Sequence, residues 1–187
     1  MMRTISTLSA MTLAAATLAL CGCAAGSGLF PKDQRVDAET IDGDWLDADG
    51  QLVMLDSTVG GGLSIVAAPG DNGEPSEQYT GVLFDINGVT VMEVLLSTDL
   101  QRGNAPVYHY ARLDLQDSGR SLVHQPLRSD WLNDQAGAAS GVRSEQADDG
   151  SSVQVTVGDP GAMRGLLRRA VRDDGAWGEP ETLTRAE

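Results

Sequence analysis

The chain has 187 residues, with 27 acidic side chains against 13 basic ones and a formal net charge of −14 at neutral pH. A surface of this sign repels phosphate backbones, so the composition argues against a nucleic-acid-binding protein. The two cysteines, Cys21 and Cys23, both lie near the N-terminus. The rest of the chain therefore cannot form a disulfide or a thiolate metal site.

The first residues have the pattern of a secretory signal. Arg3 precedes an uninterrupted run of small and apolar residues from Ile5 to Leu20, which is too short to span a bilayer comfortably. Leu20-Cys21-Gly22-Cys23 resembles a bacterial lipobox, in which the signal is cut before a cysteine that carries acyl chains such as palmitate. Cys23 fits that role, whereas Cys21 would place bulky Leu20 at the cleavage position. An ordinary cleaved signal that happens to contain two cysteines is the alternative.

We therefore predict a lipoprotein signal peptide at residues 1–22, lipidation at Cys23 and attachment to a membrane through that lipid. Removing residues 1–22 leaves 165 residues and, because Arg3 is lost, a net charge of −15. We expect residues 23–40 to comprise the acylated cysteine and a flexible tether, because this segment is small, polar and aperiodic. Residues 41–187 are expected to form a single domain. No Asp follows Cys23, so the inner-membrane retention signal of enteric lipoproteins is absent. In a bacterium with two membranes this resembles sorting to the outer membrane, on its periplasmic side.

Between Ile41 and Leu127, short apolar runs alternate with turn signals. The runs predict strands at Gly43–Leu46, Gln51–Asp56, Leu63–Ala68, Gln78–Ile86, Val89–Leu96, Pro106–Leu115 and Ser121–Leu127. Asn87-Gly88 predicts a tight hairpin, because both central residues of such a turn need positive φ. The segment 47–50, Asp-Ala-Asp-Gly, also predicts a turn. A calcium-binding loop there would require an oxygen ligand at the position of Trp45.

Beyond Leu127 the pattern is mixed. Ser129 is expected to cap a short helix that carries Trp131 and Leu132. Gly137–Ser152, which is small and polar, predicts a mobile loop. Val153–Val157 alternates as a half-buried strand.

Asp159-Pro160 predicts the start of the one substantial helix, as a cap followed by proline at the first helical position. Its apolar stripe is Met163, Leu166, Leu167, Ala170 and Val171, and its arginines are Arg164, Arg168, Arg169 and Arg172. These arginines predict a solvated face paired with nearby acids or, alternatively, a contact with lipopolysaccharide phosphates or a partner. Glu181–Arg185 predicts a closing strand. The fold class is therefore mainly β: an antiparallel meander of about eight strands, forming a barrel or sandwich, with one C-terminal helix covering an edge or an open end.

Four motifs occur in an order that resembles a family. They are Gly-x-Trp at 43–45, Tyr-x-Gly-Val-Leu-Phe at 79–84, a histidine-containing aromatic strand at 107–112 and Pro-Leu-x-x-Asp-Trp-Leu at 126–132. The chain is similar, over roughly residues 41–185, to uncharacterised bacterial outer-membrane lipoproteins with lipocalin-like barrels. Gly137–Ser152 departs from that pattern, where a longer helix is expected after Trp131. In lipocalins a tryptophan of the first strand plugs one end of the barrel and a basic residue of the last strand packs across its ring. The resemblance implies these roles for Trp45 and Arg185.

Few residues are candidates for a role in catalysis, metal binding or ligand binding. His109 shares its predicted face with Ala111 and Leu113, so it is either a hydrogen-bonded core histidine or a polar group lining a cavity. The second histidine, His124, lies on another predicted strand, and no spacing predicts a metal site for the pair. Glu93 interrupts an apolar run, and an edge or surface position is expected for it, with an interior position as the alternative.

The candidates for lining a ligand cavity are His109, Tyr110 and Trp45. We predict no catalytic residue, cofactor or metal. The function expected is that of a non-enzymatic cell-envelope protein that binds a small apolar ligand or an envelope partner. A structural or assembly accessory of the outer membrane, without a small-molecule ligand, is the alternative. An enclosed apolar cavity would favour the former and a barrel filled by its own side chains the latter.

Overall fold

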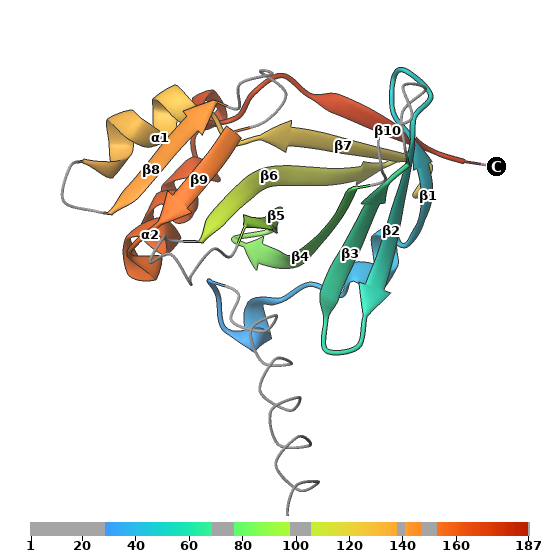
Figure 1. Ribbon diagram of the computed structural model, residues 1–187, viewed down its shortest axis with the longest axis horizontal. Coiled ribbons are helices and arrows are strands. Elements are labelled where there is room, and N and C mark those ends of the chain that lie inside the picture. Colours follow the sequence, from blue (N-terminus) through green and yellow to red (C-terminus); the bar gives the residue numbers. More distant parts are fainter. Residues whose placement is uncertain (1–28, 69–76, 98–105, 138–140, 147–152, 187) are drawn as a thin grey trace, which may run out of the picture.

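The computed structural model of the protein describes residues 29–68, 77–97, 106–137, 141–146 and 153–186 (Figure 1). The strands are β1 Gly43–Leu46, β2 Leu52–Thr58, β3 Gly62–Ala67, β4 Glu77–Ile86, β5 Val89–Ser97, β6 Val107–Gln116, β7 Ser121–Pro126, β8 Val142–Gln146, β9 Val153–Val157 and β10 Glu181–Arg185. The α-helices are α1 Ser129–Ala136 and α2 Pro160–Ala170, and the 3₁₀ turns are η2 Lys32–Gln34, η3 Ala38–Ile41 and η5 Asp174–Ala176. The predicted signal peptide, with Cys21 and Cys23, lies outside the described residues.

Eight of the strands close into an antiparallel barrel. They follow the order β1-β2-β3-β4-β5-β6-β7-β10, and β10 pairs again with β1. This confirms the predicted antiparallel meander and decides for a barrel. Closure gives the first and last strands a partner on both sides, so neither remains an exposed edge.

Local turn chemistry sets the hairpin registers. Asn87 and Gly88 both have positive φ, 58° and 84°, as the predicted tight turn between β4 and β5 requires. In the β1–β2 turn, one carboxylate oxygen of Asp47 accepts hydrogen bonds from the backbone N–H groups of Asp49 and Gln51, at 2.9 and 2.8 Å. The segment 47–50 is therefore a turn whose first carboxylate is used by its own backbone.

Alternation along the strands produces two apolar cores. The first fills the barrel and contains inward-facing residues such as Trp45, Leu83 and Leu113. The second lies against the outer face of β4, β5 and β6, and includes Phe84 and Tyr110. Each of these strands is thus buried on both faces along part of its length.

The segment between β7 and β10 leaves the barrel and builds the cover of the second core. Gly137–Ser152 contains strand β8, so the prediction of a loop there was wrong in its middle part. β8 pairs with β9, and β9 pairs with the first residues of β6. Val142 and Ser144 of β8 are buried, which is the alternation that the small, polar composition of this stretch concealed.

Helix α1 protects β8. The Asn133 side chain accepts a hydrogen bond from the Ser144 N–H at 3.1 Å and donates one to the Ser144 carbonyl at 3.0 Å. These contacts satisfy backbone groups that an exposed strand would offer to another chain. The expected cap of α1 was wrong by one position: Arg128 is the N-cap residue and Ser129 begins the helix.

Helix α2 begins as predicted, with the Asp159 side chain accepting from the Gly161 N–H at 2.8 Å and Pro160 in the first turn. Met163, Leu166, Leu167 and Ala170 are buried in the second core. The helix therefore packs over the outer face of the barrel and not over an end or an edge. No helix in the described part of the chain combines the length and hydropathy needed to cross a membrane.

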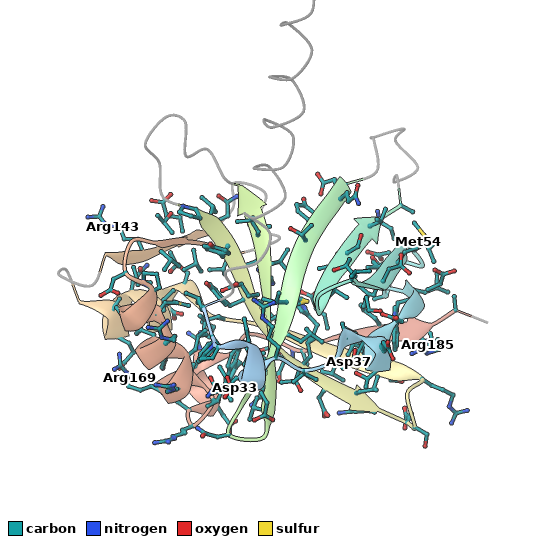
Figure 2. The ribbon with its side chains drawn as sticks, turned by 90° about the horizontal axis from the view of Figure 1, so that it is seen from below. Asp33, Asp37, Met54, Arg143, Arg169 and Arg185 are labelled. Carbon is teal, nitrogen blue, oxygen red and sulfur yellow. The ribbon has the colours of Figure 1, made fainter. Side chains whose placement is uncertain are left out.

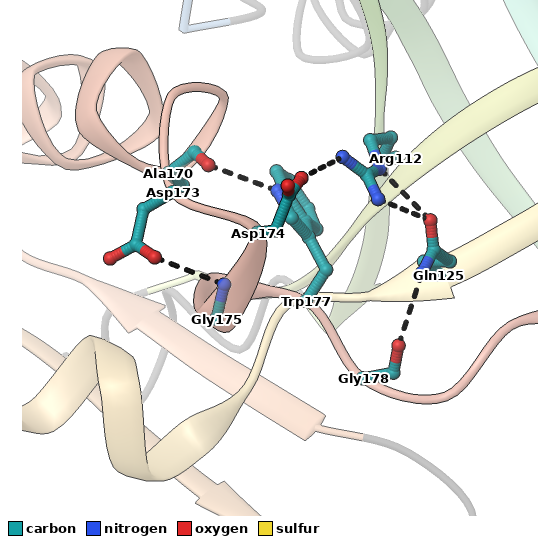
Figure 3. Close-up of polar contacts among 8 residues, drawn as sticks. All are labelled: Arg112, Gln125, Ala170, Asp173, Asp174, Gly175, Trp177 and Gly178. Atoms are coloured by element: carbon teal, nitrogen blue, oxygen red, sulfur yellow. Dashed lines mark hydrogen bonds and ion pairs between the residues drawn. The ribbon is translucent and has the colours of Figure 1, made fainter.

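A polar network joins the end of α2 to the barrel (Figure 3). The Trp177 indole donates to the Ala170 carbonyl at 3.0 Å, and the Arg112 guanidinium lies 5.7 Å from the Trp177 ring. Arg112 also donates to the Gln125 side-chain oxygen, and Gln125 donates to the Gly178 carbonyl at 3.3 Å. These contacts fix the route by which the chain returns to the barrel as β10.

We call the segment from Leu29 to Thr40 the N-terminal arm. Figure 2, in which Asp33 and Asp37 of this arm are labelled, shows that it runs along the domain. Leu29 and Phe30 are buried in the second core, where the Phe30 ring lies 5.0 Å from that of Phe84. The Val36 N–H donates to the Leu83 carbonyl at 3.0 Å. The prediction of a flexible tether was therefore wrong for residues 29–40, because apolar pairing orders them. The folded unit begins well before residue 41.

Candidate functional site

The interior of the barrel contains an apolar pocket of about 240 Å³. Its lining residues are Asp47, Val53, Leu55, Ile65, Met92, Leu113, Leu122, His124, Glu181 and Leu183. They come from six strands and one turn, because inward-facing positions of successive strands converge inside a closed barrel. The pocket lies toward the end at which β1 finishes and β2 and β10 begin.

The opposite end of the barrel is closed. Trp45 has no solvent exposure, and its indole N–H donates to the Ile41 carbonyl at 2.9 Å. Ile41 and Ala38, from η3, are buried beside it. An aromatic ring and a short 3₁₀ turn therefore fill this end of the barrel.

Arg185 packs on the Trp45 ring at this closed end. Its guanidinium lies 4.4 Å from the centre of the Trp45 ring, and the two residues are register partners between β10 and β1. The Arg185 side chain also donates to the carbonyls of Gly119 at 2.9 Å and Asp42 at 2.7 Å. The expected contact between Trp45 and Arg185 is confirmed.

Strand pairing brings the two histidines together at the side of the pocket. Their Nε2 atoms are 3.2 Å apart and the rings are stacked, with centres separated by 5.4 Å. The His109 Nδ1 lies 3.4 Å from the Val153 carbonyl, which can only accept, so this nitrogen carries a proton. In neutral His109 the Nε2 atom is then bare and accepts from the Nε2–H of His124.

The charges of this group follow from burial. Burial, followed by the neighbouring His124, lowers the pKa of His109 to about 4, so this ring is neutral at neutral pH. The pKa of Glu181 is also lowered, chiefly by the adjacent imidazole of His124. Its carboxylate lies 3.7 Å from the His124 Nδ1. The chain of contacts therefore runs from an ionised carboxylate, through two imidazoles, to a backbone carbonyl.

The Nε2 atom of His124 contacts His109 and its Nδ1 lies 3.7 Å from Glu181, so both ring nitrogens have protein neighbours. Glu181 approaches Nδ1, on the far side of the ring from the Nε2 pair. Among the described residues, no group of three or more His, Cys, Asp or Glu side chains is arranged to hold a metal ion.

The three cavity candidates lie in different places. His109 leaves β6 on the interior face, and Trp45 forms the closed end. Tyr110 leaves the other face of β6 and lies in the second core, so the structure does not bring it together with the other two. His124, Asp47 and Glu181 were not among the candidates, although Leu122–His124 and Glu181–Leu183 show the alternation that places them inside.

A second buried polar group surrounds Glu93. This side chain is only 5% exposed, on the outer face of a strand paired on both sides, so the expected edge or surface position was wrong. The Tyr110 hydroxyl donates to its carboxylate at 3.0 Å. Burial raises the pKa of Glu93 to about 7, against the opposing effects of Tyr110, the Leu29 N–H and the positive charge of Arg35. The N-terminal arm thus contributes both a donor and a charge to this carboxylate.

Comparisons of the chain with protein-family models, with curated proteins and with solved structures found no match. The fold is therefore characterised by its own strand order. A closed, eight-stranded antiparallel meander with a helix packed on its outer side has lipocalin-like topology, here with α1, β8, β9 and α2 inserted between the seventh and eighth barrel strands.

Proposed function

We propose that this protein is a non-enzymatic, lipid-anchored protein of the cell envelope whose barrel binds a small apolar ligand. The observation that carries the proposal is the apolar pocket of about 240 Å³ inside the barrel. Its volume lies just below the roughly 300–1,000 Å³ of typical sites for drug-sized ligands. A compact ligand, or the end of a longer chain, suits it best.

The resemblance to lipocalin-like outer-membrane lipoproteins belongs to the same proposal. The closed meander and the stacking of Arg185 on Trp45 support it. A barrel filled by its own side chains would favour the structural accessory instead. The pocket therefore favours a ligand over an accessory that works by its outer surface alone.

Attachment is proposed at Cys23, on the periplasmic side of the outer membrane. Five residues separate Cys23 from Leu29, which is buried in the second core. Even fully extended, this connection reaches only about 20 Å. An acylated Cys23 would thus hold the domain close to the bilayer surface.

The ligand is tested by native mass spectrometry of the full-length protein purified from its own host. We expect a co-purifying small molecule that is absent from Ile65→Trp, in which an indole fills the pocket, provided that this variant still unfolds cooperatively. Wild-type protein that carries nothing and binds no apolar probe would leave the accessory role in place of the ligand-binding one.

Anchoring is tested by metabolic labelling with a palmitate analogue. Cys23→Ala is expected to abolish labelling and to slow processing of the precursor, whereas Cys21→Ala should change neither. Loss of labelling in Cys21→Ala alone would move the lipid to the other cysteine.

A further inference from the structure

We infer that the pocket selects an amphiphile with a positively charged head group, such as a primary alkylammonium. This inference rests on the proposed function and names the class of ligand. Its basis is the combination of apolar walls with carboxylates at one end of the barrel. Asp47 and Glu181 line the same pocket as seven aliphatic side chains.

Asp47 is held in place by its turn. Its Oδ1 accepts from two backbone N–H groups, which orients the carboxylate without neutralising it. The residue is half-buried at the point where β1 ends. A cationic group at this position would therefore meet a pre-organised carboxylate.

Glu181 supplies the second carboxylate from the first residue of β10. It pairs in register with His124, and its side chain is 68% exposed. The adjacent imidazole of His124 lowers the pKa of Glu181, which favours its ionised form. Glu181 therefore remains negative under the conditions in which an alkylamine is protonated.

Glu77 adds a third carboxylate at this end. Val53, Ala67 and Glu77 are register partners across β2, β3 and β4, so all three side chains leave the sheet on the interior face. The Tyr79 hydroxyl donates to the Glu77 carboxylate at 2.5 Å. Three carboxylates therefore lie at this end of the barrel, beside the imidazole of His124.

The described lining of the pocket contains neither Lys nor Arg. The nearest cation along β10, Arg185, is bound to backbone carbonyls and stacked on Trp45 at the closed end. With a net charge of −14 on the chain, carboxylate and phosphate head groups are repelled. A neutral head group gains nothing from these carboxylates, while an ammonium is attracted.

Three probes of equal chain length test the inference: decylamine, decanol and decanoate, each below its micelle concentration. Binding is measured by isothermal titration calorimetry at low salt, on the full chain carrying Cys23→Ser so that no acyl chain of its own competes. We expect decylamine to bind roughly tenfold more tightly than decanol, decanoate to bind most weakly, and added salt to reduce the difference.

Variants assign the effect to residues. Glu181→Gln and Asp47→Asn are each expected to weaken decylamine about three- to fivefold, the upper part of the range for exposed ion pairs, and to leave decanol unchanged. Asn at position 47 keeps the oxygen that the turn requires. Asp56→Asn removes the same charge from an exposed position on the outer face of β2 and should affect neither probe.

The outcomes separate the two proposals. Equal affinity for decylamine and decanol, or tightest binding of decanoate, overturns the cationic preference and leaves the apolar pocket as a ligand site. Binding of none of the three probes by folded protein overturns the ligand-binding proposal itself. A decylamine advantage that Asp56→Asn reduces as much as the pocket variants do would reflect overall charge, and would also overturn the inference.

Discussion

Glu93 and His109 are titratable groups on opposite faces of adjacent strands, and they respond to pH in opposite ways. The pKa of Glu93 is raised to about 7, so the folded state holds its proton where the unfolded chain has released it. Its contribution to stability is present below about pH 4.5 and is lost as the pH rises through 7. The pKa of His109 is lowered to about 4. Its contribution is present above about pH 6.5 and is lost as the pH falls toward 4.

Glu93→Gln separates the two effects. The amide keeps an acceptor for the Tyr110 hydroxyl but carries no charge into the second core. We expect the variant to be more stable than wild type at pH 8, by about 1–3 kcal/mol, and to lose the decline between pH 5 and 8. Urea unfolding at several pH values measures this.

In the same variant the effect of His109 should become visible. The free energy of unfolding should fall as the pH drops from 6.5 to 5, and Glu93→Gln/His109→Gln should not show this fall. A Glu93→Gln protein that is less stable than wild type at pH 8 would mean that the ionised carboxylate, with Arg35 and the Leu29 N–H, stabilises the N-terminal arm more than its burial costs.

The sequence could not reveal the surroundings of Glu93. Its partners, Leu29, Arg35 and Tyr110, are separated from it by 17 to 64 positions, and two of them lie in a segment whose composition is typical of a linker. The two histidines present the same problem. Each lies at an inward-facing position of a predicted strand, but only the register of β6, β7 and β9 brings them to 3.2 Å.

At the scale of elements, the patterns that sequence predicts best are those whose signal is local. The bounds of β1, β9 and β10 match the predicted ranges, and Asp159-Pro160 marks the start of α2. Strand β8 was missed because only Val142 marks its apolar face, since the other buried side chain, Ser144, is polar and bonded to Ser129. When a neighbouring helix stabilises a strand through polar contacts, the sequence of that strand shows little apolar alternation.

The arginines of α2 also differ from expectation. Arg164 donates to the Leu29 carbonyl at 2.9 Å, and the Arg168 guanidinium lies 5.8 Å from the centre of the Phe30 ring. Arg169 donates to the Gln135 carbonyl. The contacts described for these three side chains are thus to carbonyls and a ring, where pairing with acids was predicted. Two of them hold the N-terminal arm.

Truncation of the apolar stripe of α2 should be far more damaging than truncation of its arginines. Leu167 has no solvent exposure, and replacing a buried leucine with alanine costs about 2–5 kcal/mol. Leu167→Ala should lower the melting temperature by about 10 °C, as followed by circular dichroism. Arg168→Ala, from an exposed position, loses one cation–π contact of less than about 1 kcal/mol. Similar shifts in the two variants would contradict the packing of α2 described above.

At the scale of the whole molecule, closure depends on residues at the two ends of the barrel sequence. The sequence suggested the partners Trp45 and Arg185 through the lipocalin resemblance. It did not suggest why Gly43 stands before them. A Cβ atom at Gly43 would lie 2.5 Å from the Arg185 Nη1, and the residue has a φ of 136°. Glycine therefore makes room for the guanidinium on the tryptophan ring.

Arg185→Ala should loosen the seam between β1 and β10. It removes the stacking on Trp45, worth about 0.5–2 kcal/mol, and two hydrogen bonds from a charged donor to the carbonyls of Gly119 and Asp42. We expect a loss of about 2–4 kcal/mol in the free energy of unfolding. Gly43→Ala should act in the same direction, because its methyl group displaces the same guanidinium.

Hydrogen exchange distinguishes a local opening of the barrel from a general loss of stability. In Arg185→Ala, the amides that pair β1 with β10 should exchange much faster relative to those that pair β4 with β5, because only the seam loses its side-chain clamp. The matched control is Arg120→Ala, which removes a guanidinium from an exposed position in the adjoining β6–β7 turn and should leave both sets protected. Uniformly faster exchange in Arg185→Ala would show that the stack contributes to overall stability and that backbone pairing alone keeps the barrel closed.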